Sequence, residues 1–160
     1  MLELRPITEQ GRRQLYDMVN GPADMYESIP WGAGVSIHDD DRCVGYMAFL
    51  VVKGMTPSIV GHGLPGERDK FVEAGPLCME WACGCYSVFR CFAVTAASKD
   101  LYMMVGGSSF REVDPKETGG YCYELTFEKE FAIEYMMKLL HSYSLLLDYT
   151  PTLRQLSLPV

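Results

Sequence analysis

The sequence predicts an α/β protein in which helices flank a mixed sheet. The 160 residues are 48% hydrophobic and 22% charged, a composition typical of globular chains that excludes disordered, collagenous and coiled-coil proteins. Strand-like and helix-like patterns alternate in the middle of the chain, and strand pairs flank them. The length is that of one ordinary domain, which is enough for a sizeable core.

The first half of the chain is dominated by strands. Thr8 is the expected N-cap of a helix that ends before Asn20, and a second short helix is expected over 23–28. The glycines near residue 62 predict a bulge or a close backbone approach. Four segments alternate in polarity or are apolar throughout, as strands are: residues 2–5, 35–38, 43–52 and 57–64.

The second half is expected to alternate helix and strand before a hairpin. Residues 68–85 have a broad apolar helical face, and Pro76 predicts a kink or a late start, because proline costs a helix interior about 3 kcal/mol. Ser98 is the expected N-cap of a short helix that ends at Val105. The other expected elements are a strand over 88–95, a hairpin of 110–113 with 121–127, and a last helix over 130–147.

The charge of the chain restricts its partners. Fourteen basic and 21 acidic residues give a net charge of −7, the wrong sign for binding nucleic acid. An acidic surface favours basic partners such as amines, polyamines or lysine-bearing proteins. The amino-terminal residues lack the apolar run of a signal peptide, and charges interrupt the apolar stretch near the carboxyl end. We therefore expect a cytoplasmic protein that is not inserted in a membrane.

The six cysteines are expected to be reduced, because the amino-terminal residues lack the apolar run of a signal peptide. Four of them cluster between residues 78 and 91, among aromatic side chains, which favours a role in filling the core. Cys83 and Cys85 are too close together in sequence for a structural zinc site, so no metal is expected. The alternative is a reactive thiol or a metal enzyme built on this cluster.

Three consecutive segments resemble the core of the Gcn5-related N-acetyltransferase (GNAT) family: SIVGHGLPGER, DKFVEAGPLCMEWACGCYS and VFRCFAVTAASKDLYMMVGGSSFREV. They match, in order, the family's strand and its R/Q-x-x-G-x-G/A loop, the helix that follows, and the strand, short helix and Gly-Phe pair. With the opening LELRPITEQGRRQLYDMV, the resemblance covers residues 2–127. It implies a mixed, mostly antiparallel sheet flanked by helices, here with an extra carboxyl-terminal helix. It is closest to compact phage-type members, matched at His62, Leu64, Pro65, Arg68 and Trp81.

The resemblance implies that acetyl-CoA binds where the loop opens the helix. Backbone N–H groups at a helix start bind pyrophosphate, and the helix dipole favours anions there. Phe71 and Glu73 stand where the family has glycines, and Asp69 and Glu73 add negative charge, so the loop is a degenerate form of the family's. The implied cofactor-binding residues are Leu64, Arg68, Asp69, Lys70, Phe71, Val72 and, at a second position, Ser98.

Direct acetyl transfer needs a base for the incoming amine and an acid for the departing thiolate. The strand before the loop contains no carboxylate, so the resemblance implies His62 as the base; the alternative is a histidine bonded to the backbone. The family's acid is a tyrosine five residues before the Phe of the Gly-Phe pair. That position, counted from Phe110, is Val105, and Tyr102 corresponds to it only if residues 106–109 contain an insertion.

Two functions are consistent with these residues. The first is an N-acetyltransferase that moves an acetyl group from acetyl-CoA to an amine or a lysine side chain. The second is a catalytically inactive protein of the same fold that acts as a protein-binding module or inhibitor. Residues 1–129 would form the core, while the helix and tail over 130–160, apolar on more than one face, would bind a partner or form a homodimer. A phage-encoded chain would act in the host cytoplasm.

Overall fold

The computed structural model describes residues 1–19, 21, 24–104, 106–131 and 134. The chain forms two compact units, Met1–Cys78 and a second that begins at Met79. The boundary falls within helix α3 (Gly75–Cys85).

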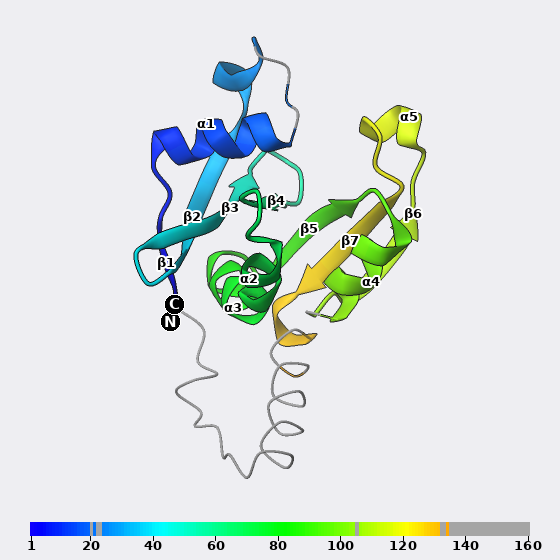
Figure 1. Cartoon of the computed structure of the whole chain (residues 1–160). Helices are drawn as coiled ribbons and strands as arrows, with labels where there is room; N and C mark the ends of the chain where they lie inside the picture. Colours follow the sequence, from blue (N-terminus) through cyan, green and yellow to red (C-terminus); the bar gives the residue numbers. More distant parts are fainter. Residues whose placement is uncertain (20, 22–23, 105, 132–133, 135–160) are drawn as a thin grey trace. The chain divides into compact units, whose positions relative to one another are not determined.

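The first unit is built on four antiparallel strands, which Figure 1 shows in blue to green. All four predicted strands are confirmed. The second begins earlier than expected, because Trp31 also pairs with Leu50, beyond a register shift between Trp31 and Gly34. The strands are β1 (Leu2–Pro6), β2 (Trp31–Asp39), β3 (Arg42–Leu50) and β4 (Ser58–Gly63), paired in that order.

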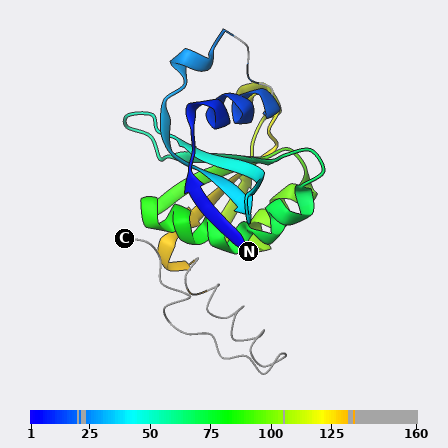
Figure 2. The same ribbon diagram turned by 60° about the vertical axis from the view of Figure 1, so that its left-hand side comes forward.

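Helices cover both faces of these four strands (Figure 2). Helix α1 (Glu9–Met18) contacts β3 and β4, and the side chain of Thr8 caps it as predicted, accepting from the Gly11 N–H at 3.0 Å. Helix α2 (Arg68–Glu73) contacts the same two strands from the other face. Between α1 and β2 the predicted second helix is a single 3₁₀ turn, η1 (Tyr26–Ser28).

One buried cluster of the first unit lies between the strands and α2. Its buried members are Ile37, Val44, Ala74 and Cys78. Val44 reaches this cluster because β3 has one extra residue opposite Ile37 and His38, a bulge that turns the side chain inward. The bulge predicted in β4 is absent from its pairing with β3, which runs in continuous register.

The second unit contains three antiparallel strands in the order β5-β7-β6. They are β5 (Val88–Ala93), β6 (Ser109–Glu112) and β7 (Tyr123–Glu128), so the predicted hairpin is confirmed. Helix α4 (Ala96–Met104) contacts β5 and β7, while the short α5 (Pro115–Thr118), which was not predicted, lies in the hairpin loop. The buried apolar side chains of these strands are Phe89, Cys91, Ala93, Leu125 and Phe127.

Two predictions about helix boundaries have different outcomes. Helix α2 ends at Glu73 and α3 begins at Gly75, so the break predicted near Pro76 is confirmed. The prediction that Ser98 caps α4 is wrong. The Ser98 N–H donates to Thr95 Oγ1 at 3.1 Å, which makes Thr95 the capping residue and places Ser98 in the first turn.

The α/β class predicted from the sequence is confirmed: both units combine strands with flanking helices. Within the described residues, no helix is both long and apolar enough to cross a membrane. Residues 129–131 are helical, as expected for the start of the last helix. Most of the segment 130–160, including its proposed contact with a partner, lies outside the described residues.

Candidate functional site

His62 lies near the end of β4, with its side chain exposed on the α1 face of the strands. Its Nδ1 is 2.6 Å from the backbone oxygen of Gly63. A carbonyl oxygen can only accept, so this bond assigns the ring proton to Nδ1 in the neutral imidazole. Nε2 then carries the lone pair and can accept a proton. His62 can therefore be bonded to the backbone, the alternative given above, and still act as a base.

Tyr46 is the direct neighbour of His62 on β3. Its hydroxyl donates to Gln14 Oε1 at 2.8 Å, and burial raises the pKa of Tyr46 to about 12, so the phenol stays protonated at neutral pH. Neither Tyr46 nor Gln14 was predicted from the sequence. The hairpin register could have identified Tyr46, because it places that residue opposite His62 on the same face.

The loop after β4 presents a helix start with free N–H groups. Glu67 is the N-cap residue of α2 and makes no side-chain cap hydrogen bond. The N–H groups of Arg68, Asp69 and Lys70 lie in the first turn, where a helix supplies no acceptor. The Phe71 N–H, in contrast, donates to the Glu67 carbonyl at 2.9 Å. Three of the predicted cofactor-binding positions thus have backbone donors available.

Phe71, which was expected to contact the cofactor, packs into the first unit's core. Its ring lies over Gly45, Gly61 and Gly63. A Cβ at Gly45 would be 2.6 Å from Phe71 Cδ2, closer than real Cβ atoms approach. The close approach predicted for the β4 glycines is thus confirmed. The side chain of Phe71 points to the sheet, and its N–H is already bonded, so neither is available to a ligand at the loop.

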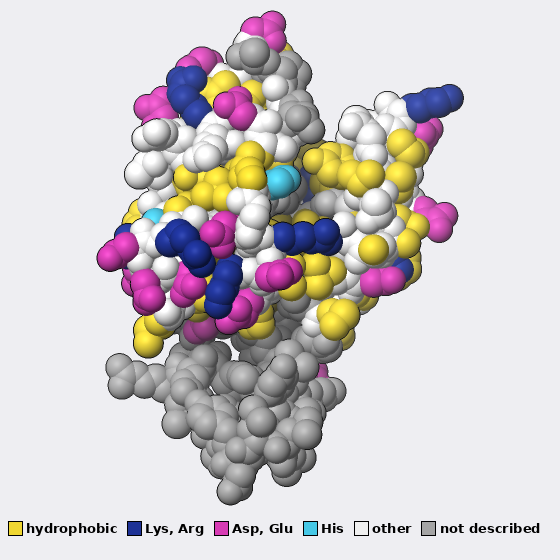
Figure 3. All heavy atoms as spheres, viewed as in Figure 1, with side chains coloured by type: hydrophobic (Ala, Val, Ile, Leu, Met, Phe, Trp, Pro, Cys, Tyr) yellow, Lys and Arg dark blue, Asp and Glu magenta, His cyan; other side chains and the backbone are white. Residues whose placement is uncertain are grey.

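A network of ion pairs connects the β2–β3 hairpin to α2, and Figure 3 shows basic and acidic side chains intermingled there. Lys70 Nζ is 3.2 Å from Glu73 Oε2 and 3.8 Å from Asp39 Oδ2, and Arg42 Nε is 3.3 Å from Glu67 Oε1. The bond to Glu73 raises the pKa of Lys70. Three acids near the loop, Asp39, Glu67 and Glu73, therefore already have cationic partners.

The strongest cationic partner of Asp39 is the amino terminus of the chain. The terminal ammonium of Met1 binds Asp39 Oδ1 at 3.1 Å and, with Lys70 and Arg42, keeps the pKa of that carboxyl below its usual value. Asp40 follows at φ 55°, in the left-handed region that turn residues adopt. The acidic run 39–41 thus comprises the last residue of β2 and the two residues of the β2–β3 turn.

In the second unit, Tyr102 lies on α4. Burial, followed by the effects of Cys91 and Tyr121, raises the pKa of Tyr102 to about 12. Its phenol is therefore protonated at neutral pH, the state that a proton donor needs. Ser98, on the same helix, donates its N–H to Thr95 and accepts from the Thr95 hydroxyl at 3.2 Å.

Glu124 of β7 is the buried acid of the second unit. Arg90 Nη1 of β5 lies 3.0 Å from its Oε1, and the guanidinium of Arg111 on β6 binds Oε2. Two cations thus share one carboxylate across three strands. This triad was not selected from the sequence, because only the strand order brings its members together.

Three of the four clustered cysteines are core residues. Cys78, Cys83 and Cys91 are buried, as predicted, whereas Cys85 is only partly buried. Burial raises the pKa of Cys78 to about 12 and that of Cys83 to about 11, so these thiols are not nucleophilic thiolates at neutral pH. Among the described residues, no group of three or more His, Cys, Asp or Glu side chains is placed to hold a metal ion.

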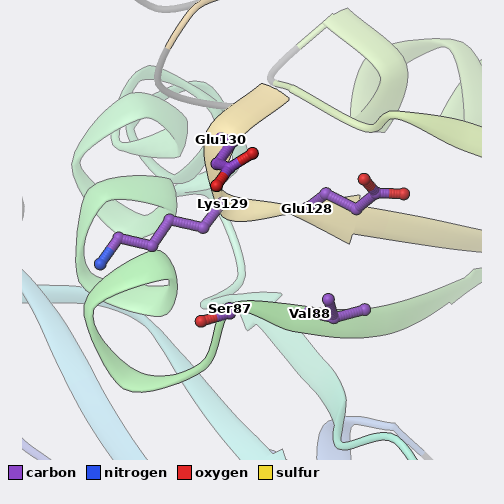
Figure 4. A pocket seen from close by; sticks show the side chains of 5 residues that line it. All are labelled: Ser87, Val88, Glu128, Lys129 and Glu130. Atoms are coloured by element: carbon purple, nitrogen blue, oxygen red, sulfur yellow. The ribbon is translucent and has the colours of Figure 1, made fainter.

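A pocket of about 280 Å³ lies at the start of β5 and the end of β7 in the second unit (Figure 4). The side chains of Glu128 and Lys129 point in opposite directions there, so they do not converge on one ligand. None of the predicted site residues lines this pocket, which is formed by Ser87, Val88, Glu128, Lys129 and Glu130.

Solved structures of acetyltransferases share this fold. No family model matches the sequence, and neither does any curated protein. An N-acetyltransferase from Staphylococcus aureus Mu50 aligns with a TM-score of 0.57 at 13% identity, over 81% of this chain and 98% of its own. A spermidine N-acetyltransferase, a chimera of Vibrio cholerae SpeG and hSSAT, aligns at 0.58 and 12%, over 84% and 98%.

An acetyltransferase from Agrobacterium tumefaciens aligns with a TM-score of 0.53 at 14% identity, over 79% of this chain and 90% of its own. At such identities the likeness is one of fold. The chain has the GNAT fold, as its sequence predicted, and the structures that share the fold include N-acetyltransferases.

Proposed function

We propose that the protein is an N-acetyltransferase that transfers the acetyl group of acetyl-CoA to an amine or a lysine side chain. The observation that carries the proposal is His62, an exposed imidazole whose Nδ1 bond to Gly63 leaves Nε2 free to accept a proton. It lies on the strand that leads into the loop with free helix N–H groups. The shared fold supports the same reaction class but does not by itself fix a function.

The first unit's loop is the proposed site for the diphosphate of acetyl-CoA. The N–H groups of Arg68, Asp69 and Lys70 are donors without helix partners, and the helix dipole favours an anion at this end. Arg68 adds a positive side chain, and Phe71 leaves the loop backbone uncovered because its ring points to the sheet. Leu64, Val72 and Ser98 remain predicted contacts.

The proposed roles of the side chains follow from their proton states. When bound, acetyl-CoA supplies a thioester whose carbonyl carbon the amine nitrogen attacks, so that a C–N bond forms and the C–S bond breaks. An acceptor that binds as an ammonium must lose one proton before its nitrogen can attack, and His62 Nε2 takes that proton; the second N–H proton leaves to solvent once the C–N bond has formed. The phenol of Tyr102, protonated at neutral pH, gives its proton to the departing sulfur.

The acceptor is proposed to be a cationic amine. The net charge of −7 attracts cations, and the Vibrio cholerae chimera with the same fold is a spermidine acetyltransferase. A polyamine and a lysine side chain present the same ammonium group, so both remain candidate acceptors.

The second candidate is a protein-binding module or inhibitor without catalytic activity. The observation in its favour is the pairing of Lys70 with Glu73 and Asp39, which leaves that cation less available to phosphates. Asp69 also places a carboxylate in the first turn of α2.

Release of the CoA thiol tests the proposal. Purified full-length protein is mixed with acetyl-CoA and, separately, spermidine, a primary alkylamine or a lysine-containing peptide, with a reaction lacking amine as control. We expect thiol release that depends on at least one amine. Acetyl-CoA binding without amine-dependent release for any acceptor would favour the binding module instead.

A further inference from the structure

His62 lies between two glycines that share one neighbour. Gly61 and Gly63 flank it on β4, and both side-chain positions face α2, whereas the imidazole faces α1. The ring of Phe71 occupies the α2 side. One aromatic side chain, that of Phe71, therefore packs against the residues before and after His62, on the face of β4 opposite the imidazole.

A side chain at either glycine would force its neighbours to shift. A Cβ at Gly63 would lie 3.0 Å from Phe71 Cβ, and one at Gly61 would lie 3.2 Å from Phe71 Cζ. Gly45, across the ladder on β3, faces the same ring and would place a Cβ 2.8 Å from the His62 carbonyl oxygen. The bulky side chain of Phe71 thus packs directly on the backbone of three glycines.

This packing acts on the group that orients the imidazole. The Gly63 carbonyl accepts from His62 Nδ1 at 2.6 Å, and Gly63 is the glycine that Phe71 approaches with both its Cβ and its first ring atom, Cγ. The next residue is also fixed, because the Leu64 N–H donates to the Val44 carbonyl at 2.8 Å. The position of the Gly63 carbonyl therefore depends on the ring seated behind it.

We infer that Phe71 is a positioning residue for His62. By packing on Gly45, Gly61 and Gly63, it holds the Gly63 carbonyl in place. That oxygen then keeps His62 in the Nδ1–H form, which leaves Nε2 as the proton acceptor. The role of Nε2 as a base rests on the proposed function, but the positioning itself does not. Phe71 therefore has a structural role: its large side chain fills the space that the three glycines leave on the α2 side of the strands.

The tautomer of His62 can be measured directly. Long-range ¹⁵N–¹H spectra of the labelled full-length protein report which ring nitrogen carries the proton, and His62→Gln identifies the signals of this residue. The spectra are taken at about pH 8.5, where an ordinary histidine is neutral. We expect Nδ1–H as the dominant form in the native protein. In Phe71→Ala, the Nε2–H form that free imidazole side chains prefer in water should become dominant.

A matched control removes the same ring elsewhere. Phe92→Ala removes a ring from β5 of the second unit, where the centroids of the Phe92 and Tyr121 rings are 5.6 Å apart. This substitution should leave the His62 signals unchanged. Where Phe71→Ala does not fold, Phe71→Leu keeps an apolar side chain and should give a mixture of the two forms.

Two results would overturn the inference: an Nε2–H imidazole in the native protein, or an unchanged Nδ1–H form in a folded Phe71 variant. The spectra need no acetyl-CoA, so this outcome is independent of whether the chain is an acetyltransferase. Failure of the proposed function would instead be seen as absence of acetyl-CoA binding or turnover.

Discussion

The two compact units use their charged side chains differently. In the first unit, Lys70 and Glu73 form an ion pair with side chains that are 40% and 59% exposed. In the second, the side chain of Glu124 is 9% exposed and lies between two arginines. Water screens the exposed pair, so its partners can be exchanged at little cost, whereas a buried carboxylate cannot lose its partners without a large penalty. The first unit is thus suited to binding a charged ligand, and the second to holding its sheet together.

The candidate proton-transfer groups differ in the same way. His62 of the first unit is exposed and has one ring nitrogen free. Tyr102 of the second unit is largely buried, and burial raises its pKa to about 12. An exposed imidazole suits acceptance of a proton from an incoming amine, while a phenol with a raised pKa keeps its proton at neutral pH and so can donate a hydrogen bond to a departing sulfur.

The largest expected effect is on the stability of the second unit. Glu124→Gln should lower the free energy of unfolding by about 2–4 kcal/mol, because it removes the charge that neutralises Arg90 and Arg111. Chemical denaturation measures this change. Glu128→Gln, on the same strand but exposed, is the control and should change stability by less than about 0.5 kcal/mol. Equal effects of the two substitutions would remove the distinction between buried and exposed charge.

His62→Ala should have the next largest effect. Loss of the proton acceptor is expected to lower kcat by about 100-fold or more, while the dissociation constant for acetyl-CoA stays unchanged. His38→Ala removes an imidazole that is bonded to Ser36 Oγ at 2.9 Å and should leave kcat close to that of the native protein. Unchanged turnover in His62→Ala would exclude His62 from the mechanism.

Tyr102→Phe should have a smaller effect on turnover. The substitution removes the acid, but a thiolate has a pKa of only about 8.5 and can leave without full protonation, so kcat should fall about 10-fold. Steady-state kinetics with a fixed amine measure the change. A loss as large as that of His62→Ala would mean that the second unit contributes more to the chemistry than the comparison implies.

The raised pKa of Tyr102 also predicts how stability depends on pH. The unfolded tyrosine loses its proton near pH 10, whereas the folded one keeps it up to about pH 12. Between these values the folded state binds more protons, so stability falls as pH rises. From pH 10 to 11 Tyr102 should account for about 1 kcal/mol of this loss. Denaturation of Tyr102→Phe should show a correspondingly shallower decline, and an identical slope would contradict the buried phenol.

The smallest effect concerns the exposed ion pairs. Glu73→Gln removes a carboxylate from Lys70 and should strengthen acetyl-CoA binding about two- to fivefold, the range of an exposed pair. Glu9→Gln on α1 makes the same change in net charge, at a residue paired with Arg13, and should leave binding unchanged. Tighter binding in both variants would point to net charge rather than to the Lys70 pair.

Local patterns in the sequence were sufficient for most of the fold. Alternation along 2–5 and 121–127, the cap at Thr8 and the break near Pro76 are each fixed by a few neighbouring residues, and all are found in the structure. The α4 cap was assigned to the wrong residue because Thr95 and Ser98 are both good capping residues. Of the two alternatives predicted for the β4 glycines, the close approach is the one found. The bulge in β3 was not predicted, because β3 is apolar on both faces and alternation does not reveal the extra residue at Val44.

The site could be predicted only in part. The sequence selected His62 and the start of α2, which the chain places in one unit. It could not show that Phe71 packs on glycines 45, 61 and 63, because those contacts depend on the register of β3 with β4 and on the placement of α2. The pairing of Arg42 with Glu67, and of Glu124 with its two arginines, depends on tertiary neighbours in the same way.

Calorimetric titration of the full-length protein with acetyl-CoA tests the central claim most directly, because every proposed step requires the first unit's loop to bind this molecule. The proposed function predicts saturable binding to one site with a micromolar dissociation constant, and stronger binding in Glu73→Gln. Absence of binding at millimolar acetyl-CoA, in both the native protein and this variant, would contradict the acetyltransferase assignment.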